Sequence, residues 1–260
     1  MNAVLARILA SGMVTTADGR SIPHDSSISA EEGLALQHLI RRYKPSTTLE
    51  IGLAYGTSAL FICEALTEVG GERHIVIDPA QEGWQRIGLL NFERAGYLPL
   101  VEFHEQPSYR ALPMLEAAGR RVDFAFIDGW HTFDYVMVDF FYVDRLLNVG
   151  GLIVIDDAFS YPAIRKIVRY IATHRRYRPV ETGVSGHPSV ARRLLNLAAA
   201  PLRTGPLRRA ASRVIRPDVL EPDGTLGLSM GELVAFEKTG EDLLGDGSDG
   251  SRRWDQHHEF

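Results

Sequence analysis

The sequence predicts an α/β protein with a seven-stranded, mostly parallel sheet and helices on both faces. Strand-like and helix-like segments alternate from residue 29 onward. A short apolar strand, a glycine-containing loop and the start of a helix follow one another directly in TLEIGLAYGTSAL, residues 48–60. The chain of 260 residues is also long enough for one α/β domain with an elaboration.

The individual elements follow from apolar spacing and from turn residues. Ser29 precedes Glu32 by three positions, a capping-box pattern that predicts a helix ending before Pro45. We expect strands at residues 48–51, 74–78, 100–104, 122–127, 151–156, 177–182 and 232–238. We expect the later helices at residues 58–67, 84–95, 109–118, 133–147 and 161–173.

The last two strands lack a crossover helix of the earlier type, so we expect them to pair antiparallel around an insert at 184–230. We expect the insert to form two short helices that either pack on the domain or a second subunit, or bind an anionic or lipid-linked substrate. We expect the whole chain to divide into an N-terminal extension (1–28), a main domain (29–240) that contains the insert, and a flexible tail (241–260). The insert is rich in arginine, with Arg192, Arg193, Arg203, Arg208, Arg209, Arg213 and Arg216.

Composition excludes several classes of function. A net charge of −5 and a pI near 6.0 give no reason to expect a nucleic-acid partner. The single cysteine, Cys63, cannot form an internal disulfide, which favours the cytoplasm. We expect no membrane span, because no apolar run approaches about 20 residues, and no signal peptide, because the N-terminus lacks a clear cleavage site.

The loop after the first strand does not have the spacing of a dinucleotide site. In the register Gly-x-Gly-x-x-Gly, Ala54 and Thr57 occupy the second and third glycine positions, where their side chains would crowd a pyrophosphate. The Walker sequence is also absent. Because of these differences, an NAD-dependent oxidoreductase is only the third hypothesis for the function.

The spacing that is present combines Glu50, Gly52, Gly56 and Ser58. It suits a ligand with an amino acid at one end and adenosine at the other, because the glycines leave room and the serine offers a hydroxyl. Asp78 ends the next strand, where a carboxylate can accept both hydroxyls of a ribose. Each carboxylate has an alternative structural use, Glu50 in the turn and Asp78 as a strand-end cap.

Three carboxylates are expected at the same edge of the sheet. Asp128 ends one strand, and the pair Asp156 and Asp157 ends the next. A divalent cation relieves the repulsion among such groups, and oxygen ligands favour Mg²⁺, Mn²⁺ or Ca²⁺. His131 is near enough in sequence to be a fourth ligand or a base. Alternatively, Asp156 or Asp157 caps the next helix, and Asp128 hydrogen-bonds the amino group of the cofactor.

These motifs, in this order, resemble the class I S-adenosylmethionine-dependent methyltransferases over residues 25–182 and the final strand. The resemblance is to the cation-dependent, catechol O-methyltransferase-like members, which have a Rossmann-like sheet with a reversed last strand. It implies that Asp78 binds ribose, that Ser108 and Tyr109 border the adenine, and that the aspartates described above hold Mg²⁺ or Mn²⁺. His131 replaces the catalytic lysine of such enzymes, which puts catechol substrates in doubt.

The leading hypothesis is therefore an O-methyltransferase that uses S-adenosyl-L-methionine and a divalent cation. The expected acceptor is a hydroxyl of a small molecule or sugar, and the arginines of the insert are compatible with an anionic acceptor or with a homo-oligomer. The alternatives are a metal-independent methyltransferase and a non-catalytic module that binds a partner.

Overall fold

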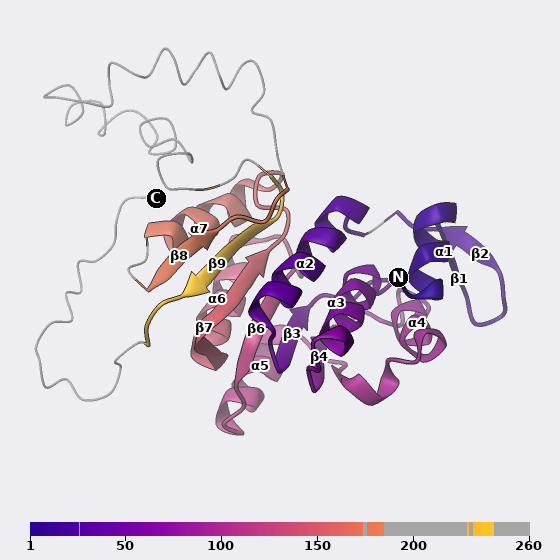
Figure 1. The fold of residues 1–260 in the computed structure, drawn as a ribbon, viewed down its shortest axis with the longest axis horizontal. Coiled ribbons are helices and arrows are strands. Elements are labelled where there is room, and N and C mark those ends of the chain that lie inside the picture. Colours follow the sequence, from indigo (N-terminus) through magenta and orange to yellow (C-terminus); the bar gives the residue numbers. More distant parts are fainter. Residues whose placement is uncertain (26, 174–175, 185–227, 229–230, 242–260) are drawn as a thin grey trace, which may run out of the picture.

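The computed structural model of the protein describes residues 1–25, 27–173, 176–184, 228 and 231–241 (Figure 1). The α-helices are α1 (Ala3–Ser11), α2 (Ala30–Tyr43), α3 (Thr57–Glu68), α4 (Ile87–Ala95), α5 (Ser108–Ala117), α6 (Phe133–Leu146) and α7 (Pro162–Thr173), with a 3-10 turn at Leu98–Leu100. The strands are β1 (Met13–Thr15), β2 (Ser21–Pro23), β3 (Thr47–Ile51), β4 (Arg73–Ile77), β5 (Val101–His104), β6 (Val122–Ile127), β7 (Leu147–Ile155), β8 (Tyr177–Val180) and β9 (Val234–Lys238).

The main sheet has seven strands in the order β5-β4-β3-β6-β7-β9-β8 (Figure 1). β9 runs antiparallel to both of its neighbours, and the other pairings are parallel. The expected reversed last strand and the antiparallel pairing of the last two strands are therefore confirmed. Of the predicted insert (184–230) and tail (241–260), the structure describes residues 184, 228 and 241. The two helices expected in the insert lie outside the described residues.

The strands are buried on both faces, as expected for a sheet between two layers of helices. One apolar cluster joins the sheet to α5, α6 and α7, and another joins it to α1, α2 and α3. Ala125 and Ile127 belong to the first cluster, whereas Phe124 and Phe126 belong to the second. This alternation along β6 fixes which side chains face each helical layer.

The register of the central strands brings their ends level. Ile51, the last residue of β3, pairs with both Ile77 of β4 and Ile127 of β6. Ile127 pairs in turn with Ile155, the last residue of β7. The residues that follow these four strands therefore meet at a single edge of the sheet.

Capping explains where α2 begins. The Ser29 hydroxyl accepts the backbone N–H of Glu32 at 3.2 Å, and the Glu32 carboxylate accepts the N–H of Ser29 at 2.7 Å. The capping box predicted from the sequence is therefore confirmed. This contact also holds the Glu32 carboxylate at the N-terminal end of α2, a position that affects the acidic cluster described below.

Two element boundaries differ from the expectation by more than two residues. α4 begins at Ile87 rather than 84, because Gln85 and Arg86 adopt left-handed φ angles of 52° and 54°, which interrupt a helix. β7 begins at Leu147 rather than 151, and its pairing with β6 shifts register after Val122. The left-handed φ of Gly150, 86°, lies within that irregular segment.

The N-terminal extension contains structure that the sequence analysis did not assign. α1 packs against α3 and α4, and β1 pairs antiparallel with β2. The Asn2 side chain caps α1 by accepting the N–H of Val4 at 2.9 Å. In the part of the chain that the structure describes, no helix has both the length and the apolar character needed to cross a bilayer.

Candidate cofactor and cation site at the sheet edge

The first glycine of the loop after β3 permits close contact with the neighbouring strand end. Gly52 has φ +95°, and a Cβ placed there would lie 2.1 Å from the backbone oxygen of Asp128. Gly56 has φ +80°, and a Cβ there would lie 3.2 Å from the Cα of Gly88. The space that these glycines leave, which the sequence analysis assigned to a ligand, is occupied in part by protein backbone.

Beneath this loop lies a buried polar network around Glu50. The Glu50 side chain is fully buried, and the Ser58 hydroxyl donates a hydrogen bond to its Oε1. Nε2 of His74 lies 2.8 Å from Glu50 Oε2, and Nδ1 of His74 lies 2.9 Å from Thr48 Oγ1. Both oxygens of Glu50 are thus engaged by side chains, so Glu50 and Ser58 support the loop from below.

Asp78 also supports the loop. Its Oδ2 accepts the backbone N–H groups of Leu53 and Ala54 at 2.9 and 3.0 Å, and its Oδ1 accepts the N–H of Ala80 at 2.6 Å. Gln81 donates a further hydrogen bond to Oδ2 at 3.0 Å. The carboxylate therefore ties the end of β4 to the loop after β3, and it lies beside that loop as the sequence predicts.

The two residues expected beside an adenine face different surroundings. Ser108, the first residue of α5, is buried. Tyr109 is 43% exposed, and its ring packs edge-on against Tyr135 with 6.0 Å between centroids. The ring of Trp130, 68% exposed, lies 6.3 Å from Tyr135. Tyr109 thus belongs to a surface group of aromatic rings, whereas Ser108 points inward.

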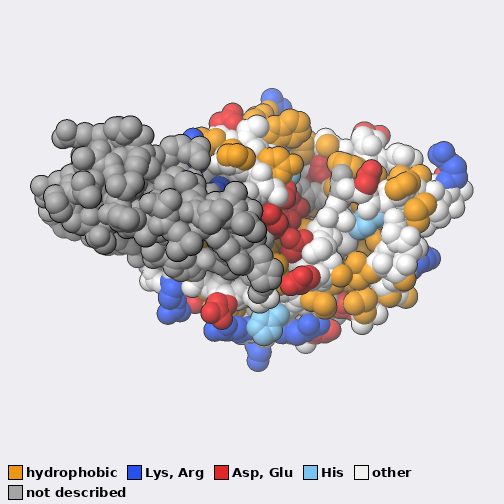
Figure 2. Space-filling view, turned by 90° about the horizontal axis from the view of Figure 1, so that it is seen from above, with side chains coloured by type: hydrophobic (Ala, Val, Ile, Leu, Met, Phe, Trp, Pro, Cys, Tyr) orange, Lys and Arg blue, Asp and Glu red, His pale blue; other side chains and the backbone are white. Residues whose placement is uncertain are grey.

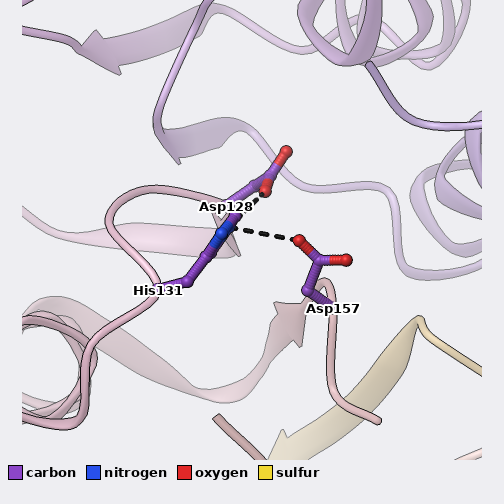
Figure 3. Close-up of side chains that lie close together, drawn as sticks. All are labelled: Asp128, His131 and Asp157. Carbon is purple, nitrogen blue, oxygen red and sulfur yellow. Dashed lines mark ion pairs between the residues drawn. The ribbon is translucent and has the colours of Figure 1, made fainter. Parts of the chain in front are cut away.

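Asp128, His131 and Asp157 converge at the carboxyl ends of β6 and β7 (Figure 3). Nε2 of His131 lies 3.5 Å from Oδ1 of Asp128 and 3.2 Å from Oδ2 of Asp157. Each residue has a ligand atom within 4.8 Å of those of the other two. When the molecule is viewed from the top of Figure 1, Asp and Glu side chains gather near the centre of the face that is shown (Figure 2).

Asp156, the remaining predicted ligand, has a different environment. It is 7% exposed, and its Oδ1 is buried without a hydrogen-bond partner among the described residues. It is not among the three residues whose ligand atoms cluster, although electrostatic repulsion from Asp128 acts on it. Asp157, the next residue, adopts a left-handed φ of 55°, which turns its side chain away from the strand path.

Burial and repulsion raise the pKa values of these carboxyl groups. Burial is the main cause that raises the pKa of Asp128 to about 6, and the nearby imidazole of His131 opposes this shift. Burial, followed by repulsion from Asp128 and Glu32, raises the pKa of Asp156 to about 8. Burial also raises the pKa of Asp157, and the interaction with the Asp128 carboxyl group raises the pKa of His131.

This donor set fits a hard divalent cation. It combines carboxylate oxygens with an imidazole nitrogen, and two of its buried atoms, Oδ1 of Asp156 and Nε2 of His131, lack a hydrogen-bond partner in the part of the chain that the structure describes. Nε2 lies within ion-pair distance of Asp128 and Asp157, but the angles do not suit hydrogen bonds. Positive charge placed between these groups would offset their mutual repulsion.

Several residues near the site were missed by the sequence analysis. Glu32 and Glu232 add negative charge, because Glu32 raises the pKa of Asp156 and both glutamates raise the pKa of Asp157. Glu232 also accepts the N–H groups of Phe159 and Ser160 at 3.1 and 2.9 Å, which fixes the turn after β7. The capping box did identify Glu32, but no local pattern indicates that it approaches another strand end.

Comparison with known proteins agrees with this arrangement. A family model described as a methyltransferase domain matches residues 49–158. The caffeoyl-CoA O-methyltransferase of Petroselinum crispum is 35% identical over 161 residues, which cover 55% of this chain and 61% of that enzyme. The chain thus spans about three fifths of the length of the curated relatives it matches.

Solved structures share the fold. The O-methyltransferase TomG from Streptomyces achromogenes, in complex with SAM, has a TM-score of 0.56 at 19% identity, with 82% of each chain covered. An O-methyltransferase from Bacillus cereus, in complex with SAH, has a TM-score of 0.53 at 22% identity and covers 68% of this chain and 80% of that one. By sequence, residues 49–158 are therefore similar to a methyltransferase domain, and the chain is similar to caffeoyl-CoA O-methyltransferases over part of its length, while the solved O-methyltransferase structures share its fold.

Proposed function

We propose that this chain transfers the methyl group of S-adenosyl-L-methionine to a hydroxyl oxygen of a small-molecule acceptor, assisted by Mg²⁺ or Mn²⁺. The observation that carries the proposal is the convergence of Asp128, His131 and Asp157 beside the glycine loop. Gly52 packs against the backbone of Asp128, so the loop and the acidic cluster are in direct contact. A reaction that needs both cofactor and cation requires that proximity.

The cofactor is assigned to the edge of the sheet at β3, β4 and β5. The loop from Gly52 to Gly56 holds its methionine end, with Glu50 and Ser58 beneath that loop. Asp78 accepts the ribose hydroxyls, and the segment with Ser108 and Tyr109 borders the adenine. The buried hydrogen bonds of Glu50 and Asp78 support this assignment, because they hold the loop in one shape before the ligand arrives.

The cation is assigned to Asp128, Asp156 and Asp157. When bound there, a divalent cation lowers the pKa of an acceptor hydroxyl and orients it. The raised carboxyl pKa values support this set, since the folded chain holds negative charge there at an electrostatic cost that a cation would offset. Asp156 contributes a buried oxygen that lacks a partner within the described residues.

His131 is assigned as the general base. Its Nε2 takes the proton of the acceptor hydroxyl while the oxygen forms a bond to the methyl carbon and the bond from sulfur to that carbon breaks. The products are the methyl ether, S-adenosylhomocysteine and an imidazolium. Asp128 and Asp157, at 3.5 and 3.2 Å from Nε2, stabilise the imidazolium. The ring of Tyr161, 4.4 Å from that of His131 between centroids, limits its rotation.

The acceptor class rests on the relatives and on the residue at position 131. Relatives of this chain bear the name caffeoyl-CoA O-methyltransferase, which supports oxygen as the methylated atom. A histidine at 131, in place of lysine, disfavours catechols. We propose a hydroxylated small molecule or a sugar, and the arginines of the insert at 184–230 favour an acceptor with an anionic group.

The proposal is tested by measuring transfer of labelled methyl groups from S-adenosyl-L-methionine to a panel of hydroxylated small molecules and sugars. Turnover that is lost in excess chelator and restored by Mg²⁺ or Mn²⁺ is the expected result. Turnover that survives the chelator would contradict the role of the cation and favour a metal-independent methyltransferase. If calorimetry detects no binding of S-adenosylhomocysteine, a non-catalytic binding module is the better description.

A further inference from the structure

Three consecutive backbone N–H groups in the turn after β7 donate hydrogen bonds to one residue of a distant segment. The N–H of Ala158 donates to the backbone oxygen of Glu232 at 2.9 Å. The N–H groups of Phe159 and Ser160 donate to its Oε2 at 3.1 and 2.9 Å. Backbone donors of this kind need partners, and here one residue serves all three. Glu232 therefore holds the turn between Asp157 and α7 in one conformation.

Both chain neighbours of Glu232 are anchored in the fold. The Leu233 side chain is fully buried, and its backbone oxygen accepts the Thr182 hydroxyl at 3.3 Å. On the other side, a Cβ placed on Gly231 would lie 2.7 Å from the backbone oxygen of Val184, so the two segments pack closely there. Glu232 thus extends from a fixed support, and the turn after β7 is held against that support.

The turn brings two side chains to the imidazole of His131. Oδ2 of Asp157 lies 3.2 Å from Nε2, and the ring of Tyr161 lies 4.4 Å from the imidazole between centroids. The N–H of Tyr161 also donates to the backbone oxygen of Asp157 at 3.3 Å. Asp157 has a left-handed φ of 55°, which a residue other than glycine keeps only when its surroundings hold it. A shift of this turn would move both side chains relative to His131.

We propose that Glu232 is a positioning residue that keeps Asp157 and Tyr161 next to His131. It acts by accepting hydrogen bonds rather than by its charge, and its effect is transmitted through the backbone of residues 158–160. The inference rests on the proposed function, because it adds a supporting residue to the proposed base and cation site.

The test measures kcat, KM, Mn²⁺ affinity and Tm in variants at position 232. Glu232→Ala removes the side-chain acceptor, so it should weaken Mn²⁺ binding and lower kcat, each by about tenfold. KM for S-adenosyl-L-methionine and affinity for S-adenosylhomocysteine should stay within about twofold of the wild type, because the assigned cofactor residues are not in this turn. Glu232→Gln keeps one acceptor oxygen and removes the charge, so both properties should recover to within about threefold of the wild type.

A matched control lies at the amino ends of β3 and β6. Oδ2 of Asp123 accepts the consecutive backbone N–H groups of Ser46 and Thr47 at 3.0 and 3.1 Å, the same kind of contact that Glu232 makes. Asp123→Ala should lower Tm, as Glu232→Ala does, but leave kcat and Mn²⁺ affinity within about twofold of the wild type. A general loss of stability would instead affect activity equally in both variants.

The double variant Glu232→Ala with Asp157→Asn tests the route of the effect. Since Glu232 acts through the turn that places Asp157, the two losses of Mn²⁺ affinity should combine to less than their sum in free energy. The inference is overturned if Glu232→Ala keeps kcat and Mn²⁺ affinity within about twofold of the wild type, or if Glu232→Gln is as impaired as Glu232→Ala. A wild-type chain that binds no S-adenosylhomocysteine overturns the proposed function instead, and the Mn²⁺ titrations then still decide the inference.

Discussion

Nε2 of His131 lies 3.2 Å from Oδ2 of Asp157, although the two residues follow different strands of the sheet. Oδ1 of Asp128, which follows β6, lies 3.5 Å from the same nitrogen, and the ligand atoms of the three residues lie within 4.8 Å of one another (Figure 3). The imidazole nitrogen therefore faces both carboxyl groups, and a cation, a proton and an acceptor hydroxyl would all be handled within the same few ångströms.

The role of His131 predicts a selective loss of activity. His131→Ala should reduce turnover by about 10²–10⁴, the usual contribution of a general base, because no other group is assigned to accept the proton. Affinity for S-adenosylhomocysteine should change less than about threefold. Steady-state kinetics and calorimetry measure the two effects. His38→Ala, at an exposed position on α2, is the control. Turnover within threefold of the wild type would contradict the assignment.

The acidic cluster predicts a site for Mn²⁺ that depends on individual carboxylates. Asp128→Asn and Asp157→Asn should each weaken Mn²⁺ binding by about tenfold or more, because each removes one charged ligand. Titration of the metal followed by electron paramagnetic resonance measures the affinity. Asp134→Asn is the control, since Asp134 is bonded to Thr132 and is outside the cluster. Equal Mn²⁺ affinity in all three variants would show that the ion binds elsewhere.

Close packing of the first loop predicts that Gly52→Ala is more damaging than a substitution at another left-handed glycine. Gly150 has φ +86° and no atom within 4 Å of its Cβ position, so Gly150→Ala should cost only backbone strain, on the order of 1–2 kcal/mol. Gly52→Ala adds a clash at 2.1 Å with the oxygen of Asp128. Urea unfolding should show a distinctly larger loss in the free energy of unfolding for Gly52→Ala than for Gly150→Ala. Equal losses would mean that the loop shifts away from Asp128 without cost.

The burial of Asp139 predicts a pH-dependent stability difference. Its pKa is raised from 3.8 to about 6 on folding, so the folded state favours the protonated form. The corresponding stability is present below the unfolded pKa and is lost as pH rises through about 6. Asp139→Asn should therefore match the wild type near pH 4 and exceed it at pH 7, by up to about 3 kcal/mol.

Denaturant unfolding at several pH values measures this difference. Asp25→Asn, at an exposed position, is the control and should show little change in the free energy of unfolding across the same range. A difference between Asp139→Asn and the wild type that did not vary with pH would show that Asp139 stays in one protonation state.

The sequence alone predicted most of the fold. The alternation of strands and helices, the capping box at Ser29 and the reversed last strand are all present in the structure. These features depend on residues close together in the chain, where apolar spacing and turn residues act directly. The α1 helix and the β1–β2 hairpin were missed because they are short, and because α1 depends on contacts with α3 and α4 and β1 on contacts with α1.

Residue types at the site were also visible in the sequence, because parallel strands deliver their following residues to one edge. The partner of each side chain was not visible. Glu50 and Ser58 bond to one another beneath the loop, and His74 completes that network only because it lies opposite Thr48 in the register of β3 and β4. Strand register and packing decide such contacts, and neither is encoded in local spacing.

The order of residues along the chain determined that aspartates follow β6 and β7, and that a histidine comes three positions after the first of them. Only the tertiary structure decided that His131 and Asp157 meet while Oδ1 of Asp156 is buried with no hydrogen-bond partner from the described segments. The physical reason is the left-handed turn at Asp157, which directs two adjacent side chains to different surroundings.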